Sequence, residues 1–406
     1  MSGKTSLEIL NGTEAVAVGV RRADEVSEAV GERRFLHAGP PLNGEPPVGP
    51  MRGAVVGALV LDGAASSIAE AEAMADEVDL SPCHDAGAVG AMAGVISASM
   101  PVVVVEGGGY RAFAPLNEGL GQALRFGSND PETIARLRWM RDLAAPMLDH
   151  ALKAEGGIDV RALQGEALRR GDECHNRNVA ATAALAARLA TTLVESDFER
   201  SDVGDLMRYV SGNPHFFLSF SIAAGKVIVQ ALEASEDAGV VTAVAGNGRE
   251  MGIRVSGLPG RWFTAPAPVG QPKLFEGYTL DDVCPMMGDS YVTECVGLGA
   301  FAASAAPALT SFVGGDPLQI GEQTDRMREI TRGESSRYLV PFEGFRGTPI
   351  GIDVARILAS GFGPVVNNGL AHREAGRGQV GAGISELPVA PFEAANAALE
   401  AAGASA

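Results

Sequence analysis

Residues 101–109 read PVVVVEGGG, a short run of apolar residues that ends in glycines. Such a run is typical of a β-strand that is buried on both faces. Strand-like runs also occur at AVAVGV (15–20) and RRFLHAGPPL (33–42), and they alternate with helical patterns. The expected helices are ADEVSEAVGE (23–32), MRGAVVGALVLDG (51–63) and IAEAEAMADEV (68–78). Together these segments predict an N-terminal α/β domain over residues 1–130.

From about Pro131 the pattern changes to helices. DPETIARLRWM (130–140) opens with an Asp-Pro-Glu helix start signal. VRALQGEALRRGDECHN (160–176) and VAATAALAARLATTLVES (179–196) follow as further helical runs. We therefore predict a helical domain over residues 131–210, whose many alanines allow its helices to approach closely.

The last third of the chain returns to a mixed pattern. VVTAVAGNGREMGIRVSG (240–257) contains two strand-like runs joined by the turn-forming GNGRE. ECVGLGAFAASAAPALTSF (294–312) has the pattern of a small-residue helix. Further runs up to residue 384 complete a C-terminal α/β domain, which we predict over residues 211–406. The expected fold is of the mixed α/β (α+β) class, with two α/β domains flanking a helical middle segment.

Charge and cysteine content indicate where the protein works and what it does not bind. The 406-residue chain has a formal net charge of -18, which argues against a general affinity for nucleic acid or an anionic membrane. A few local arginines can still hold an anionic substrate. The four cysteines form no CxxC pair, so neither a disulfide framework nor a structural zinc site is expected. The N-terminus lacks a signal-peptide core, and the apolar runs 54–61 and 179–194 are poor membrane spans, so we expect a cytoplasmic protein.

The densest polar cluster is GDECHNRN (171–178), in which every side chain except that of Gly171 can donate, accept or titrate. Asp172 has the character of a helix N-cap, and helical spacing would place Glu173 near Arg177. A solvated helix start explains a cap and an ion pair, but it rarely packs a His, an Arg and two Asn before a long apolar run. We therefore interpret the cluster as functional. Its candidate catalytic residues are His175, Arg177, Asn176, Asp172 and Glu173.

Other polar segments give weaker signals. GNGREMG (246–252) offers Arg249, Glu250 and backbone N–H groups to a carboxylate or phosphate, but an ordinary hairpin turn explains it equally well. In MGDSYVTE (287–294), helix capping alone accounts for the Asp and the Ser. The run VVNNGLAHREAGRGQVGAGI (365–384) indicates a loop at the end of a buried strand, where sites of α/β proteins gather.

Several familiar motifs are absent from the sequence. It contains no Walker A loop, no GxSxG nucleophile elbow and no dinucleotide-binding GxGxxG motif that leads from a strand into a helix. We therefore predict no tightly bound organic cofactor. The six histidines show no HxxxH or HxH spacing, so ligand spacing gives no support for a divalent metal, although Asp172, Glu173 and Asp289 leave the question open. The residues alone predict an α/β protein that holds a small anionic or amide-containing ligand.

The chain resembles the YlbE/AllG-like family over nearly its whole length. The matching motifs include specific ones such as GDECHNRN, and they follow the family's order. They are HAGPP (37–41), GPMRGA (49–54), PCHDAGAVGAMAGVIS (82–97), LNEGLGQALRFG (116–127), GDECHNRN (171–178), NGRE (247–250), WFTAPAP (262–268), GDSYVTE (288–294), TPIGIDV (348–354) and VNNGLAHREAGRGQVGAGI (366–384). The resemblance implies a subunit of an oxamate carbamoyltransferase, working beside an FdrA-like subunit in allantoin (purine) nitrogen catabolism. The implied reaction is the reversible phosphorolysis of a ureido acid such as oxalurate to oxamate and carbamoyl phosphate.

The chemistry of that reaction assigns provisional roles. Attack on a carbamoyl carbon develops negative charge on its oxygen, so N–H donors or cations must face it, and the amine must exchange a proton. We expect His175 to transfer the proton while Arg177 and Asn176 polarise the oxygen. Arginine forks are suited to phosphate or to the substrate carboxylate. The expected substrate-binding residues are Arg52, His37, His84, Asn247, Arg249, Glu250, Asp289, Ser290, Asn367, His372 and Gln379.

Two other interpretations stay open. The chain could be a non-catalytic subunit that completes a shared site, in a homo-oligomer or in a complex with an FdrA-like partner. It could also be an amidase or hydrolase of ureido or cyclic amide compounds. A polar cluster buried in a cleft would favour catalysis, whereas clusters exposed on a flat apolar surface would favour the subunit role.

Overall fold

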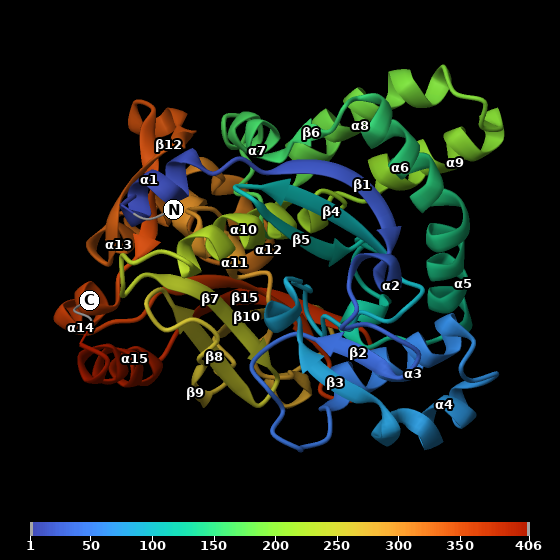
Figure 1. The fold of residues 1–406 in the computed structure, drawn as a ribbon, viewed down its shortest axis with the longest axis horizontal. Helices are drawn as coiled ribbons and strands as arrows, with labels where there is room; N and C mark the ends of the chain where they lie inside the picture. Colours follow the sequence, from blue (N-terminus) through green and yellow to red (C-terminus); the bar gives the residue numbers. More distant parts are fainter. Residues whose placement is uncertain (1–2, 404–406) are drawn as a thin grey trace.

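The computed structural model describes residues 3–403 of the chain. Its first sheet has the strand order β5-β4-β1-β6, with antiparallel neighbours (Figure 1). The VVVV run is buried in β4 between β1 and β5, so the predicted strand is confirmed. Helix α10 contacts both β4 and β5. These elements are β1 (Val16–Arg22), β4 (Pro101–Gly107), β5 (Tyr110–Pro115), β6 (Ile158–Asp159) and α10 (Leu218–Glu233).

Two further antiparallel sheets come from the C-terminal part of the chain. Their strand orders are β11-β7-β8-β9 and β10-β15-β14. Gly248 has a φ of 85° in the turn between β7 and β8, so the predicted GNGRE turn is confirmed. The strands are β7 (Val241–Asn247), β8 (Glu250–Val255), β9 (Phe263–Pro266), β10 (Gln271–Leu274), β11 (Met287–Gly288), β14 (Val365–Ala371) and β15 (Gln379–Glu386).

Two strand pairs complete the β-structure. β12 (Thr331–Val340) and β13 (Arg346–Ile352) form an antiparallel hairpin. β2 (Arg34–His37) and β3 (Asp79–Pro82) run parallel, and the chain between them forms α3 (Gly49–Asp62) and α4 (Ile68–Met74). A parallel pair needs such a crossover connection, and helices supply it here.

The middle segment is largely helical, and most of its helices lie on the right side of Figure 1. The Asp130 carboxylate accepts a hydrogen bond from the backbone N–H of Thr133 at the start of α5, as the start signal predicted. This segment holds α5 (Pro131–Trp139), α6 (Ala145–Ala154), α7 (Val160–Leu168), α8 (Val179–Val194) and α9 (Arg200–Gly212). The other helices are α1 (Ser6–Gly12), α2 (Ala23–Val26), α11 (Val292–Cys295), α12 (Thr310–Val313), α13 (Ile320–Glu329), α14 (Val354–Ser360) and α15 (Ala390–Ala401).

Three helix predictions were wrong in whole or in part. The helix predicted over 23–32 ends at Val26. Residues 294–312 do not form one helix, because α11 ends at Cys295 and short 3-10 turns follow before α12. Gly297 and Gly299 have φ values of 85° and 59°, which are left-handed conformations that interrupt a right-handed helix. The helix predicted over 160–176 ends at Leu168, so the GDECHN segment is not helical.

One large hydrophobic cluster extends from Ile9 to Leu399 and draws on all three predicted domains. Alanine and valine supply many of its members, as the composition indicated. The fold class is mixed α/β, as predicted, while the division into three domains stays a prediction. Within residues 3–403, no helix has both the length and the apolar character needed to cross a membrane.

Candidate functional site

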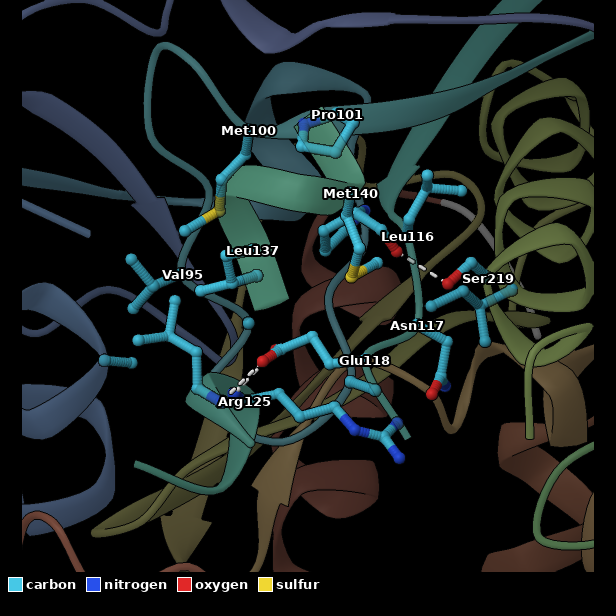
Figure 2. Close-up of a pocket in the computed structure, with 16 residues that line it drawn as sticks. Val95, Met100, Pro101, Leu116, Asn117, Glu118, Arg125, Leu137, Met140 and Ser219 are labelled. Carbon is cyan, nitrogen blue, oxygen red and sulfur yellow. Dashed lines mark hydrogen bonds between the residues drawn. The ribbon is translucent and has the colours of Figure 1, made fainter. Parts of the chain in front are cut away.

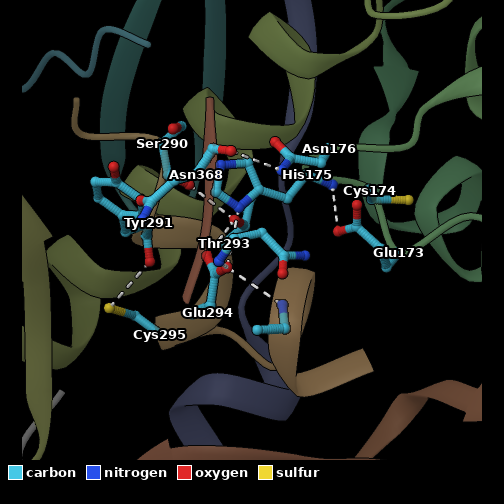
Figure 3. Close-up of polar contacts among 12 residues, drawn as sticks. Glu173, Cys174, His175, Asn176, Ser290, Tyr291, Thr293, Glu294, Cys295 and Asn368 are labelled. Atoms are coloured by element: carbon cyan, nitrogen blue, oxygen red, sulfur yellow. Dashed lines mark hydrogen bonds and ion pairs between the residues drawn. The ribbon is translucent and has the colours of Figure 1, made fainter. Parts of the chain in front are cut away.

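The GDECHNRN segment is a tight turn folded around Glu173. One carboxylate oxygen of Glu173 accepts from the backbone N–H of His175 (2.8 Å), and the other accepts from that of Arg177 (2.6 Å). Cys174 has a φ of 61°, an uncommon conformation for a residue with a side chain, and its carbonyl accepts from the Ser221 hydroxyl (2.7 Å). Burial raises the pKa of Glu173 to about 8, although these hydrogen bonds and nearby His175 act in the opposite direction. The turn presents the His175 ring toward α11 (Figure 3).

Glu294, in α11, holds His175. Its Oε1 lies 2.9 Å from His175 Nδ1 and also accepts from the backbone N–H groups of Asn367 (3.1 Å) and Ala300 (3.2 Å). Its Oε2 accepts from the Thr293 hydroxyl at 2.7 Å (Figure 3). Burial alone would lower the pKa of His175, but the adjacent Glu294 carboxylate raises it above the ordinary value. With Nδ1 engaged, Nε2 is the ring nitrogen that His175 can offer to a ligand.

His175 lines a small cavity together with three other residues that the sequence predicted for the site. These are Asn176, Ser290 and Gln379, from three separate segments of the chain. The cavity measures about 20 Å³, and its other walls are largely apolar. These walls are formed by Ala91, Met92, Leu120, Phe126, Leu218, Phe312 and Gly369.

Arg125 lines the same cavity, although the sequence analysis did not select it. Its Nε and Nη2 donate to the carbonyl of Gly119 (3.1 and 2.7 Å), and Nη1 makes no hydrogen bond to any described residue. Burial lowers the pKa of Arg125 to about 10, so the guanidinium is still charged at neutral pH. Arg125 also borders a second, largely apolar cavity, where it lies beside Glu118 and Asn117 (Figure 2). A permanent positive charge therefore reaches the cavity of His175.

His215 is a second cavity residue that the sequence analysis missed. Burial lowers its pKa to about 3, and the charges of Arg125 and His175 act in the same direction. Its ring packs against Phe312 with the centroids 5.8 Å apart. His215 is therefore a neutral imidazole at neutral pH, with one N–H donor and one acceptor. An isolated His without a spacing motif gave no signal in the sequence.

Arg177 and Asp172 do not line the cavity. Arg177 Nε donates to the carbonyl of Gly171 (3.0 Å) and lies 3.4 Å from Asp172 Oδ1. Asp172 Oδ2 accepts from the backbone N–H of Ala181 in α8 (2.9 Å), so Asp172 does stabilise the start of that helix. Burial raises the pKa of Asp172 to about 6. The expected contact of Arg177 with a carbamoyl oxygen has no geometric support in this arrangement.

The two arginines expected to hold phosphate or carboxylate also lie elsewhere. Arg52, on α3, pairs with Glu72 (3.0 Å) and Asp76 (2.6 Å). Arg249, in the β7–β8 turn, lies 3.4 Å from the Glu45 carboxylate. Neither residue lines the cavity of His175.

Asp289 and His84 belong to a separate buried group. The Asp289 carboxylate accepts from the backbone N–H groups of Gly39 (2.8 Å) and Gly90 (3.1 Å), and it lies 3.8 Å from His84 Nε2. Lys226 donates to the His84 carbonyl (3.1 Å). Burial raises the pKa of Asp289 to about 7 and lowers that of Lys226 to about 8.

The remaining predicted residues also lie outside the cavity of His175. His37 contacts the Ala38 carbonyl, and Asn247 donates to the Pro40 carbonyl. Glu250 accepts from Thr264, His372 contacts Glu374 and Asp282, and Asn367 lines a separate cleft.

Comparisons with known proteins place this chain in a family. The sequence model of the family described as "Oxamate carbamoyltransferase subunit AllG" matches residues 78–290. The oxamate carbamoyltransferase subunit AllG of Escherichia coli (strain K12) is 40% identical over 380 residues, which cover 92% of this chain and 91% of that protein. The chain belongs to the AllG family. The match to the family model contains Arg125, His175, His215 and Ser290 of the cavity, and Glu294 follows shortly after it.

Two other proteins are similar to this chain over nearly its whole length. The uncharacterized protein YahG of Escherichia coli (strain K12) is 40% identical over 398 residues, which cover 97% of this chain and 84% of that one. The crystal structure of a conserved protein of unknown function from Enterococcus faecalis V583 has a TM-score of 0.94 and 40% identity. That match covers 98% of this chain and 96% of the other. The two proteins therefore share one fold along almost the whole chain.

Proposed function

We propose that this chain carries out carbamoyl transfer as a subunit of an oxamate carbamoyltransferase-like enzyme. The reaction would be the reversible phosphorolysis of a ureido acid such as oxalurate to oxamate and carbamoyl phosphate. The observation that carries the proposal is the cavity that His175, backed by Glu294, shares with Arg125, Asn176 and Ser290. The name of the similar Escherichia coli subunit supports the same chemistry. A buried polar cluster in a cavity favours catalysis over a purely scaffolding role.

Phosphorolysis of oxalurate forms one C–O bond and breaks one C–N bond. A phosphate oxygen adds to the carbamoyl carbon, the bond to the oxamate nitrogen breaks, and that nitrogen gains a proton. Protonated His175 would donate this proton through Nε2 and recover it from the hydroxyl of hydrogen phosphate. Glu294 on Nδ1 fixes the ring and stabilises its charged form, which is what a general acid near neutral pH requires.

The other polar residues of the cavity would bind and polarise the substrate. Arg125 presents a guanidinium to the carboxylate of the ureido acid or to phosphate. Asn176 and Ser290 carry N–H and O–H donors that could face the carbamoyl oxygen as its negative charge grows. Neutral His215 adds a donor without adding charge. The proposed roles therefore move from Arg177 and Arg249 to residues that line the cavity.

The cavity must widen before a ureido acid can enter. Its volume of about 20 Å³ is about what one water molecule requires. Leu120 is partly exposed and Phe312 lies on the short helix α12, so movement of these two walls would enlarge the space. We further propose that a partner subunit, FdrA-like as the family resemblance implies, favours the open state or completes the site.

The test is carbamoyl phosphate formation from oxalurate and phosphate, coupled to carbamate kinase and ADP so that ATP is the readout. The purified chain is assayed alone and with an FdrA-like subunit, each with and without phosphate. ATP that appears only with phosphate would support carbamoyl transfer, and a need for the partner would support a shared site. Loss of oxalurate without phosphate would instead indicate a hydrolase. No consumption of oxalurate under any of these conditions would refute the proposed substrate.

The non-catalytic alternative is tested in the same complex. If the complex needs this chain but keeps full activity with His175→Gln, the chain only scaffolds the site. If His175→Gln removes the activity while the complex still assembles on a sizing column, the chain is catalytic. Asn396→Leu, on α15, serves as the matched control variant.

A further inference from the structure

Asn367 is a fully buried polar side chain without a partner. It lies in β14 with 0% of its surface exposed, and neither its amide oxygen nor its amide nitrogen makes a hydrogen bond to any of residues 3–403. An unpaired buried amide destabilises a folded protein, and buried polar groups are otherwise almost always satisfied. The backbone N–H of Asn367, by contrast, donates to Glu294 Oε1 at 3.1 Å. The side chain can therefore pair with a group that the described part of the chain does not supply.

Asn367 lines a cleft that is separate from the cavity of His175. The cleft measures about 140 Å³, whereas the cavity of His175 measures about 20 Å³. Helix α12 stands between the two, because its Thr310 and Val313 line the cleft while its Phe312 lines the cavity. The cleft thus has room for a molecule of several non-hydrogen atoms. Because the Asn367 side chain has no exposed surface in this structure, the cleft lining must shift before such a molecule can reach the amide.

The chemistry of the cleft favours an uncharged polar ligand. Its lining contains no Lys or Arg, so an anion would find no cationic partner there. Its only carboxylate, Asp316, accepts from the backbone N–H of Leu318 (2.8 Å). The other polar side chains in the lining are neutral, namely Thr310, Gln319, Gln323 and Asn367. An amide offers one acceptor and one N–H donor side by side, and its natural complement is a second amide.

We infer that this cleft binds the terminal –CO–NH₂ group of a small molecule through a paired contact with Asn367. The Asn367 oxygen accepts one N–H of the ligand, and the Asn367 nitrogen donates to the ligand carbonyl. The backbone N–H of Asn367 and the Nδ1 of His175 both contact Glu294 Oε1. A ligand bound to Asn367 is therefore linked to the proposed acid, His175, through Glu294. The inference goes beyond the proposed function and does not depend on it, because it concerns a second cleft and a binding step only.

The test compares acetamide with acetate. The two have nearly the same shape, but only acetamide carries N–H donors. Ligand-observed NMR on the full chain measures binding of each at millimolar concentration. We expect acetamide to bind to the wild-type protein and acetate to bind at least tenfold more weakly. No detectable acetamide binding, or equal binding of acetate, would overturn the inference.

Asn367→Leu keeps the size of the side chain and removes its hydrogen-bonding atoms. We expect acetamide affinity to fall at least tenfold while the melting temperature is unchanged or higher, since an unpaired buried amide is removed. Asn396→Leu is the matched control and should bind acetamide like the wild type. If Asn367→Leu does not fold, the position of acetamide in soaked wild-type crystals decides: contact with the Asn367 amide supports the inference and any other position refutes it.

His175→Gln separates this inference from the proposed function. It should keep acetamide binding, because His175 does not line the cleft. Retained acetamide binding without any carbamoyl transfer would leave the amide site standing alone. Carbamoyl transfer without Asn367-dependent acetamide binding would leave the transferase standing and remove the amide site.

Discussion

Replacing Glu294 by glutamine removes one negative charge from the site and keeps the shape of the side chain. Glu294 Oε1 accepts from the backbone N–H groups of Ala300 and Asn367 as well as facing His175 Nδ1, and the glutamine oxygen can continue to accept these bonds. The new amide nitrogen would face the Thr293 hydroxyl, which can accept a hydrogen bond as well as donate one. The substitution therefore changes mainly the charge beside His175.

The distance between the two groups sets the size of the effect. Opposite unit charges separated by 2.9 Å attract by about 1.4 kcal/mol at the dielectric constant of water and by about 6 kcal/mol at an effective dielectric constant of about 20. Since one pKa unit corresponds to about 1.4 kcal/mol, Glu294→Gln should lower the pKa of His175 by about 1 to 4 units. The wild-type value is raised by Glu294, so the imidazolium of the variant survives only at lower pH.

The assay is the pH dependence of phosphorolysis, with carbamoyl phosphate measured in quenched samples. Because protonated His175 gives its proton to the leaving nitrogen, activity should fall as pH rises through the pKa of His175. This fall should move to lower pH by the same 1 to 4 units in Glu294→Gln. NMR titration of the labelled His175 ring should give a matching shift, and Glu393→Gln on the exposed face of α15 should give none. If activity falls at the same pH in Glu294→Gln as in the wild type, or if the His175 ring titrates at the same pH in both, the reasoning is refuted.

Three further predictions follow from single contacts. Arg125→Leu should raise the KM for oxalurate about 10- to 100-fold, because a hydrogen bond to a charged group contributes about 1.5–3 kcal/mol; an unchanged KM would exclude Arg125 from binding. Gly299→Ala should shift the pH profile as Glu294→Gln does and lower the melting temperature, because its Cβ would overlap the Glu294 carboxylate at a φ of 59°; a wild-type profile would contradict this. Asp172 has a folded pKa of about 6, above its ordinary value, so its contribution to stability is present below about pH 4 and is lost as pH rises through 6. Between pH 4 and pH 7.5, the free energy of unfolding measured with urea should therefore fall by about 1–3 kcal/mol less for Asp172→Asn than for the wild type. An equal fall in both proteins would contradict the raised pKa of Asp172.

Local sequence signals predicted the parts of the fold that local chemistry decides. Four consecutive valines form β4, and Asp130 followed by Pro131 begins α5. The prediction of one helix over the alanine-rich run 294–312 was wrong because Gly297 and Gly299 adopt left-handed conformations there. The buried Glu294 then accepts the backbone N–H of Ala300 in that irregular segment, which a continuous helix would have used itself. Tertiary contacts therefore decided the structure of this segment, and the sequence contains no local sign of them.

The sequence predicted four residues that line the cavity. GDECHNRN pointed to His175 and Asn176, and two other polar segments pointed to Ser290 and Gln379. Arg177 is two residues from His175, but its side chain turns back to Gly171 and Asp172. The short distance along the sequence therefore misled the prediction of a catalytic role for Arg177.

The partners of His175 come from distant parts of the chain. Arg125, His215 and Glu294 reach it from segments 50, 40 and 119 positions away. No spacing rule connects such positions. The packing of α10, α11 and the segment after β5 brings them together, and this packing appears only in three dimensions.

The most direct test of the central claim is the rate of carbamoyl phosphate formation from oxalurate and phosphate by the wild-type complex and by the same complex with His175→Gln. Gln keeps a polar side chain of similar length but cannot carry the proton. We predict that the variant complex assembles normally and loses at least about 100-fold in kcat, the lower range for general acid–base catalysis. A variant with wild-type kcat would contradict the account, because the proton would then be transferred by another group and the cavity of His175 would not be the catalytic site.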